Sequence, residues 1–262
     1  GHKFKSKGDA EVLVHLFEEF GKNLVHHIRG MYAIAVYDLQ NSKLTLITDR
    51  FGKKPILWAE PKSGQFIFAS EFKSLSKGLP DSFSIDPNLT AILQVFELGY
   101  ISAPQTAYEG IYSLPPASIL EWSSQGLEVY QYWNPVFQEN LNYSESQWKD
   151  QVKLKIEEAV KIRLISERPI GSFLSGGIDS SIVSAMMQQH SANQIQTFTI
   201  GFEDARFDES HWAREISRVI GSNHNELIVK PDPVVLLNTI ANTFDQPFAD
   251  SSAIPTFLVS QL

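Results

Sequence analysis

The sequence predicts two domains, an α+β layered domain followed by an α/β domain with a doubly wound parallel sheet. Three observations support this prediction. Short apolar runs separated by turn residues fill much of the first half, strands alternate with helices in the second half, and the pattern changes near residues 136–143. We therefore expect domains at residues 1–135 and 144–262. A chain of 262 residues is long enough to bury a core in both.

The first half is expected to contain two helices and several short strands. The helices are predicted at residues 10–20, where apolar side chains recur at helical spacing, and at 88–98. Strands at 31–38 and 43–48 are joined by the turn residues Gln40-Asn41-Ser42, which indicates a hairpin. The other predicted strands are residues 55–59, 65–70, 118–122 and 129–133.

The second half opens with Ser144-Glu145-Ser146-Gln147, which fits a capping box and starts a helix expected to reach about residue 165. Strands are then predicted at residues 170–174, 196–202 and 226–229. They alternate with helices predicted at residues 180–189, 209–220 and 234–244. Such alternation favours right-handed βαβ crossovers and a parallel sheet.

Composition excludes several classes of protein. The formal charge of −8 argues against general binding to nucleic acid. No apolar run approaches the ~18 residues that span a bilayer, so no membrane partner is expected. Cysteine is absent, which excludes disulfides, thiolate zinc sites and a thiol nucleophile within these residues. The seven histidines show no zinc-ligand spacing. We expect a cytoplasmic protein, because a chain without cysteine suits a reducing compartment.

The stretch with the most chemical information is Ser175-Gly176-Gly177-Ile178-Asp179-Ser180-Ser181, which leaves a predicted strand and enters a predicted helix. At such a junction, free backbone N–H groups and the helix dipole form an anion site. The two glycines let the backbone approach a phosphate closely. Asp179 becomes useful if Mg²⁺ bridges it to the phosphate oxygens. The alternative is a Gly-Ser turn that only caps a helix.

This loop resembles the pyrophosphate-binding loop of the N-type ATP pyrophosphatases. Further segments resemble, in order, successive blocks of the glutamine-hydrolysing asparagine synthetases: residues 8–13, 29–33, 49–55, 69–73, 114–116, 197–202, 207–210, 224–226 and 250–253. The resemblance implies that residues 1–135 form a glutaminase domain of the N-terminal-nucleophile class, without its N-terminal part. It implies that residues 144–262 form an ATP pyrophosphatase domain, without its C-terminal part. It also implies an ammonia tunnel between them.

The resemblance assigns residues to ligands. Asp9 matches the carboxylate that holds the α-amino group of glutamine; the alternative is an N-cap for the helix that follows. ATP would be bound by Phe173, Ser175, Gly176, Gly177, Asp179, Ser180, Ser181 and Ile200. Without the resemblance, Phe173 and Ile200 would be taken as core residues. Asp179 would be the metal ligand, for Mg²⁺.

Three segments with acidic residues each keep two interpretations. Asp49, beside Arg50, is either part of a structural ion pair or catalytic. Asp208 and Glu209 either approach substrate or metal, or begin a helix. The segment Asp250-Ser251-Ser252 either binds the amino-acid substrate or caps a helix.

The reaction implied is the ATP-dependent conversion of aspartate and glutamine to asparagine, glutamate, AMP and pyrophosphate. Two alternatives stay open: amidation of another carboxylate, such as a sugar acid, and a non-catalytic nucleotide-binding homologue. No catalytic residue is assigned, because the family's nucleophilic cysteine is absent. We expect a chain truncated at both ends and inactive alone. The formation of a homo-oligomer is a further possibility that the sequence leaves open.

Overall fold

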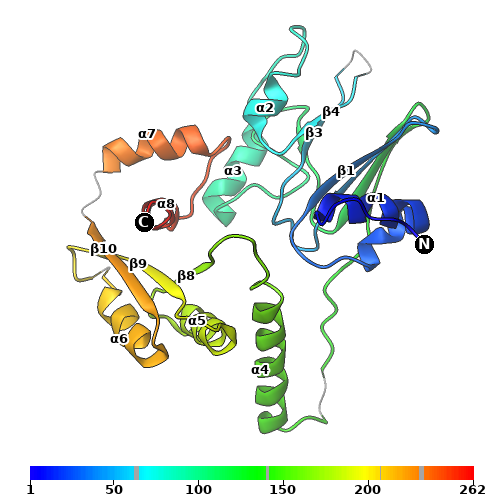
Figure 1. Cartoon of the computed structure of the whole chain (residues 1–262). Coiled ribbons are helices and arrows are strands. Elements are labelled where there is room, and N and C mark those ends of the chain that lie inside the picture. Colours follow the sequence, from blue (N-terminus) through cyan, green and yellow to red (C-terminus); the bar gives the residue numbers. More distant parts are fainter. Residues whose placement is uncertain (62–64, 140–141, 207, 230–232) are drawn as a thin grey trace. The chain divides into compact units, whose positions relative to one another are not determined.

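The computed structural model describes residues 1–61, 65–139, 142–206, 208–229 and 233–262, without the side chains of 233–235. The chain forms two compact units, the first from residues 1–137 and 243–249 and the second from 138–242 and 250–262. Figure 1 traces their elements in chain order. The predicted boundary near residues 136–143 includes residues 140 and 141, which lie outside the described residues.

The first unit contains helices and two antiparallel sheets. Its helices are α1 (Asp9–Phe20), the 3-10 helix η1 (Gly21–His26), α2 (Phe72–Ser76) and α3 (Leu89–Leu98). Its strands are β1 (Ala33–Asp38), β2 (Lys43–Thr48), β3 (Leu57–Ala59), β4 (Ile67–Ala69), β5 (Tyr112–Ser113), β6 (Ser118–Ser123) and β7 (Gly126–Gln131). The strand orders are β1-β2-β6-β7 and β4-β3-β5. The predicted hairpin is confirmed, since β1 and β2 pair antiparallel with Asp38 opposite Lys43.

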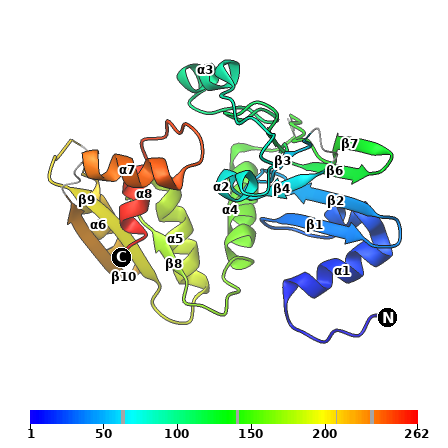
Figure 2. The ribbon, with the colours of Figure 1, turned by 90° about the horizontal axis from the view of Figure 1, so that it is seen from above.

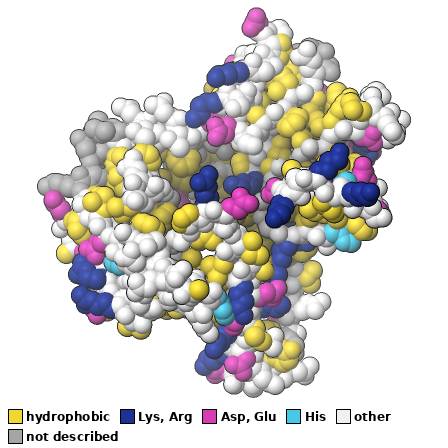
Figure 3. Space-filling view, in the orientation of Figure 1, with side chains coloured by type: hydrophobic (Ala, Val, Ile, Leu, Met, Phe, Trp, Pro, Cys, Tyr) yellow, Lys and Arg dark blue, Asp and Glu magenta, His cyan; other side chains and the backbone are white. Residues whose placement is uncertain are grey.

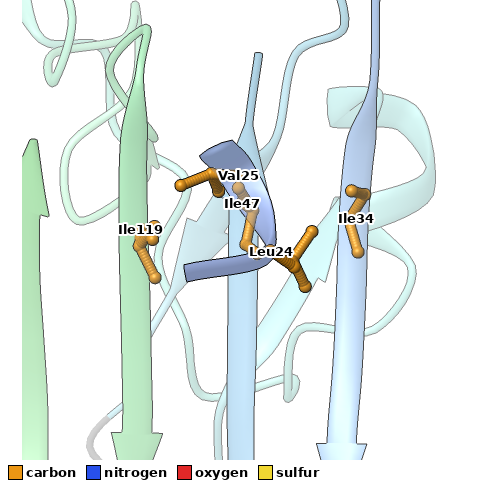
Figure 4. Packing of buried hydrophobic residues seen from close by; sticks show 5 residues of the cluster. All are labelled: Leu24, Val25, Ile34, Ile47 and Ile119. Atoms are coloured by element: carbon orange, nitrogen blue, oxygen red, sulfur yellow. The ribbon is translucent and has the colours of Figure 1, made fainter. Parts of the chain in front are cut away.

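β2 lies inside the larger sheet and is buried on both faces, because its side chains alternate between two apolar clusters. On one face Ile47 joins a cluster completed by Leu24, Val25, Ile34 and Ile119 (Figure 4). On the other face Leu46 joins a cluster completed by Leu44, Ile56, Leu114 and Leu120. Helix α1 packs three apolar side chains on the first cluster and follows the β1 side of this sheet (Figure 2). The end of β2, where Asp49 follows, is therefore held in place from both faces.

The second unit is built on a parallel sheet. Its elements are α4 (Glu145–Lys161), β8 (Gly171–Phe173), α5 (Ile178–His190), β9 (Gln196–Phe202), α6 (Ser210–Ile220), β10 (Asn223–Val229), α7 (Pro233–Thr243) and α8 (Ala253–Val259). The strand order is β10-β9-β8, and both pairs are parallel, as predicted. Helices α5 and α6 lie on one face of this sheet and α8 contacts β9 from the other (Figure 1). Helix α8 was not predicted, because seven residues that include Pro255 give little helical periodicity.

None of the described helices is both long enough and apolar enough to cross a bilayer. On the face shown in Figure 3, acidic and basic side chains are interspersed with apolar ones, so the formal charge of −8 is not gathered in one patch there.

A buried hydroxyl pair joins β8 to α5. Ser172 Oγ and Ser184 Oγ are 2.9 Å apart, and Ser184 is fully buried. Replacing Ser184 by alanine is expected to cost about 1–3 kcal/mol, because the Ser172 hydroxyl keeps only a 3.4 Å contact with the Phe173 carbonyl. Amide hydrogen exchange in β8 and α5 would measure this loss. The Ser172→Ala/Ser184→Ala double variant is the control, since removing both partners should restore part of the stability. Equal or greater loss in the double variant would contradict the prediction.

Candidate functional site

The strand–helix loop after β8 forms the base of the candidate site. β8 ends at Phe173, the Leu174 N–H donates to the Phe198 carbonyl, and α5 begins at Ile178. The N-cap of α5 is Gly177, which has no side chain to cap the helix. The first-turn N–H groups of α5 are therefore not capped by this residue and can bind an anion.

Two glycines shape the loop in different ways. Gly176 has φ +85°, a left-handed conformation that favours glycine. A Cβ at Gly176 would lie 2.5 Å from Trp212 Cβ and 2.8 Å from the Ala213 nitrogen, so this glycine lets the loop pack against α6. Gly177 has φ −71°, and a Cβ there would meet only Ser175 Oγ at 3.4 Å.

The three loop serines form hydrogen bonds within the loop. Ser175 Oγ and Ser180 Oγ are 3.0 Å apart, and the Ser175 N–H donates to Ser180 Oγ at 3.2 Å. Ser181 Oγ donates to the Gly177 carbonyl at 2.7 Å. These hydroxyls hold the backbone of the loop in one conformation, so they contribute to an anion site first by positioning its N–H groups.

A groove of about 290 Å³ lies beside the loop, on the face of β9 that α8 covers. The structure brings together three predicted residues there, because Phe173, Ser175 and Ile200 all line this groove. The prediction missed the other lining residues, which include Phe198, Phe202, Glu209, Pro255, Thr256 and Val259. Phe198 and Phe202 could have been found from the period of two along β9, since they share a face with Ile200.

Asp179 lies in the first turn of α5 and is exposed. Its position, two residues after the N-cap, places a carboxylate next to the helix N-terminus, where a negative side chain is also favourable for the helix. An exposed carboxylate beside an anion-binding N-terminus has the donor chemistry that Mg²⁺ prefers.

Asp208 organises the start of α6. Its Oδ1 accepts hydrogen bonds from the N–H groups of Phe202 and Ser210 at 3.2 and 3.1 Å, and its Oδ2 accepts from Ser210 Oγ at 3.1 Å. Burial opposes ionisation, but these bonds outweigh it and lower the pKa of Asp208. The structural interpretation of Asp208 is therefore supported, while Glu209 lines the groove.

Asp250 makes a local turn before α8. Its Oδ1 accepts a hydrogen bond from the Ser252 N–H at 2.8 Å, and its main-chain carbonyl accepts one from the Ala253 N–H. The N-cap of α8 is Ser252, whose side chain makes no capping hydrogen bond, so Asp250 shapes the turn before the helix and does not cap it. Of the segment 207–210, Phe207 lies outside the described residues.

Asp9 lies in the first unit, and the loop lies in the second. It is the first residue of α1, and the N-cap is Gly8, so the alternative interpretation of Asp9 as the N-cap is wrong by one residue. Its side chain is exposed. A groove of about 950 Å³ runs between α1 and β1 from the residue that follows Asp9. The assignment of Asp9 to glutamine stays a prediction.

Asp49 forms a buried turn centre after β2. Only 1% exposed, its carboxylate accepts hydrogen bonds from the N–H groups of residues 32, 51, 53 and 54. Burial favours the neutral acid, but these four donors prevail and lower the pKa of Asp49. Arg50 points elsewhere and donates to the carbonyls of Val25 and Ile28. The position is structural, although it is organised by backbone donors and not by the expected ion pair.

A larger groove of about 730 Å³ lies between α4 and α5 and is lined mostly by apolar side chains, including Trp148, Ile156 and Met187. It does not include the strand–helix loop or its uncapped helix N-terminus. Of these two grooves in the second unit, the 290 Å³ groove is the one that lies beside the loop.

Together, a helix-and-sheet unit and a parallel-sheet unit with a glycine-containing strand–helix loop define a two-part α/β protein. Comparison with known families identifies the first part: the chain belongs to the glutamine amidotransferase domain family, whose model matches residues 1–133. The asparagine synthase family matches residues 151–262.

Curated relatives agree with both matches. Asparagine synthetase (glutamine-hydrolyzing) 3 of Bacillus subtilis is 30% identical over 90% of this chain and 40% of its own length. Asparagine synthetase (glutamine-hydrolyzing) 1 of the same organism is 29% identical over 100% of this chain and 41% of its own length. The chain thus spans less than half the length of these two relatives. A solved structure of glutamine PRPP amidotransferase from B. subtilis, complexed with ADP and GMP, is 15% identical in sequence to this chain, with a TM-score of 0.33. The match covers 91% of this chain and 45% of the amidotransferase chain.

Proposed function

We propose that this chain is part of an enzyme that makes asparagine from aspartate, with ATP to activate the carboxylate and glutamine to supply the nitrogen. The observation that carries the proposal is the loop at residues 175–181, with its uncapped helix N-terminus beside the groove lined by Phe173 and Ile200. The names of the relatives support the choice of substrates. We also propose a cytoplasmic location, on the sequence ground that cysteine is absent.

In this proposal the second unit binds ATP and the first unit binds glutamine through Asp9. The first-turn N–H groups of α5 would hold the phosphates, and Gly177 would allow their close approach. The adenosine would lie in the groove against Phe173 and Ile200. Helices on both faces of β10-β9-β8 support the doubly wound fold for this domain.

Asp179 is the residue of the loop that fits Mg²⁺. When bound, Mg²⁺ would neutralise charge on the departing pyrophosphate. The chain's own contribution is to position the phosphates with fixed backbone N–H groups, which need no reorganisation as charge develops.

The test is ATP binding to the 262-residue chain, measured by titration calorimetry with and without Mg²⁺. Wild type is expected to bind ATP more tightly with Mg²⁺, and Asp179→Asn is expected to lose about tenfold in affinity only when Mg²⁺ is present. Without the metal, the same change should leave binding equal or tighter, because it removes a negative charge near the phosphates.

Asp150→Asn is the matched control, since Asp150 is an exposed carboxylate on α4 outside the loop. It should leave both affinities unchanged. The assignment of Asp179 fails if its variant keeps the wild-type dependence on Mg²⁺.

A second experiment identifies which carboxylate substrate the enzyme amidates. The whole protein, supplied with glutamine and ATP, is expected to release AMP and pyrophosphate with aspartate. Release with a sugar acid and not with aspartate would favour the related amidotransferase. Absence of release with either, together with retained ATP binding, would favour a nucleotide-binding homologue.

A further inference from the structure

Two histidines and a glutamate converge near the start of the first unit. His15 and Glu18 are three residues apart on α1, and His2 lies in the segment before this helix. His15 Nδ1 lies 3.1 Å from Glu18 Oε2, and His2 Nδ1 lies 3.5 Å from the same oxygen. The two imidazole rings are stacked with their centroids 4.2 Å apart. One ligand atom from each residue lies within 4.8 Å of the others.

The outer nitrogen of each ring faces a further carboxylate. His2 Nε2 lies 2.9 Å from Glu19 Oε1. His15 Nε2 is buried, has no hydrogen-bond partner among the described residues, and lies 3.9 Å from Glu11 Oε1. Glu11 is itself fixed by the Lys5 and Ser6 N–H groups at 2.7 and 2.6 Å. Metal-binding histidines usually have such a carboxylate on the nitrogen that does not bind the metal, where it fixes the ring and its tautomer.

We propose that His2, His15 and Glu18 form a binding site for a divalent transition metal of the Zn²⁺ type. Bonds of ~2.0–2.1 Å in a tetrahedral site place neighbouring ligand atoms ~3.3 Å apart, which agrees with the 3.1 and 3.5 Å separations here. Two imidazoles and one carboxylate leave the fourth position to water. Bound metal would tie the segment at residues 1–8 to α1, directly before Asp9.

The sequence did not indicate this site. The spacing from His2 to His15 matches no zinc motif, and the two are brought together only when the segment before α1 folds back along the helix. Contacts of Phe4 with His15 and of Ser6 with Glu11 hold that segment in place.

The test uses the untagged 262-residue chain stripped of metal, titrated with Co²⁺ and followed by its visible absorption, with Zn²⁺ as competitor. One Co²⁺ per chain is expected, with the strong absorption of low coordination number, displaced by one equivalent of Zn²⁺. His15→Ala and Glu18→Gln should each weaken binding at least tenfold. His26→Ala, which removes an exposed histidine of η1, is the control and should change nothing.

Further variants distinguish a site made of these three side chains from metal binding by the amino terminus. Glu19→Gln should weaken binding about tenfold, as expected for a carboxylate behind a ligand. Acetylation of the Gly1 amine should leave affinity unchanged. Glu18 is 57% exposed, so its variant can be checked for an unaltered circular dichroism spectrum. The proposal is overturned if Glu18→Gln binds as wild type does, or if acetylation abolishes binding.

Discussion

Replacing Asp49 by asparagine is expected to remove about 3–5 kcal/mol of stability from the first unit. The buried carboxylate accepts hydrogen bonds from four backbone N–H groups, two at Oδ1 and two at Oδ2. An asparagine keeps the shape but offers one acceptor oxygen, and its NH₂ group meets donors. At least two of these N–H groups then lose their partners, and the turn that joins β2 to the next segment loosens.

Amide hydrogen exchange, followed separately in β2 and in β9, would measure this effect, because unfolding of a chain with two units need not be two-state. Protection is expected to fall in β1, β2 and β6 and to stay unchanged in β9. Asp38→Asn is the matched control. Asp38 also accepts two turn N–H groups, from Gln40 and Asn41, but at an exposed hairpin end, so its loss should be much smaller. Equal losses for the two variants would disprove the central role of Asp49.

The same residue gives the stability a defined dependence on pH. The pKa of Asp49 is lowered from its ordinary value of 3.8, so unfolding at acid pH takes up a proton. Its contribution is therefore complete above the unfolded pKa and is lost as the pH falls through the lowered folded pKa. The difference in stability between wild type and Asp49→Asn should narrow over that acid range. A difference that is constant down to the acid transition would contradict the lowered pKa.

The sequence predicted those parts of the fold that depend on local periodicity. The hairpin of β1 and β2 and the alternation of β8, α5, β9 and α6 agree with the structure because side-chain period and turn residues determine them within a short window. Their ends differ by a few residues; for example, β10 begins at Asn223, three residues before the predicted start. Pairing with β9 extends it, since backbone bonds reach beyond the apolar run.

The role of Asp49 was not predictable in the same way. Its donors come partly from residues 51–54, which are local, but also from Tyr32, which lies next to it only after β1 pairs with β2. Arg50, adjacent in sequence, donates to the carbonyls of Val25 in η1 and Ile28 and not to Asp49. Adjacent opposite charges indicate an ion pair only where the backbone directs both side chains to one side.

Local sequence patterns likewise predict one part of the candidate site and not the other. Phe173, Ser175 and Ile200 line one groove because parallel pairing sets β8 beside β9, which the alternation of strands and helices predicts. The side of the groove formed by α8 comes from residues more than fifty positions further along the chain, and no local pattern links them to β9. Only tertiary contacts bring such residues to the groove, so a local sequence pattern does not identify them.

Replacing Gly176 by alanine is expected to destabilise the second unit by about 2–4 kcal/mol and to weaken ATP binding at least tenfold. The residue has φ +85°, which is unfavourable for alanine, and the new Cβ would lie 2.5 Å from Trp212 Cβ and 2.8 Å from the Ala213 nitrogen. The backbone atoms of α6 cannot move aside without loss of packing on β9. The loop must shift instead, and it carries the N–H groups proposed to bind phosphate.

Gly177→Ala separates this strain from the proposed role of the loop in binding. Its φ of −71° suits alanine, and the nearest atom to a new Cβ is Ser175 Oγ at 3.4 Å, so stability should stay within about 0.5 kcal/mol of wild type. Hydrogen exchange in α5 and α6 would measure stability, and calorimetry would measure ATP binding. If phosphate lies against the loop backbone, Gly177→Ala loses affinity without losing stability, whereas Gly176→Ala loses both. Wild-type affinity in both variants would mean that phosphate does not contact this backbone, and equal stability of the two variants would mean that the approach of the loop to α6 is not fixed by Gly176.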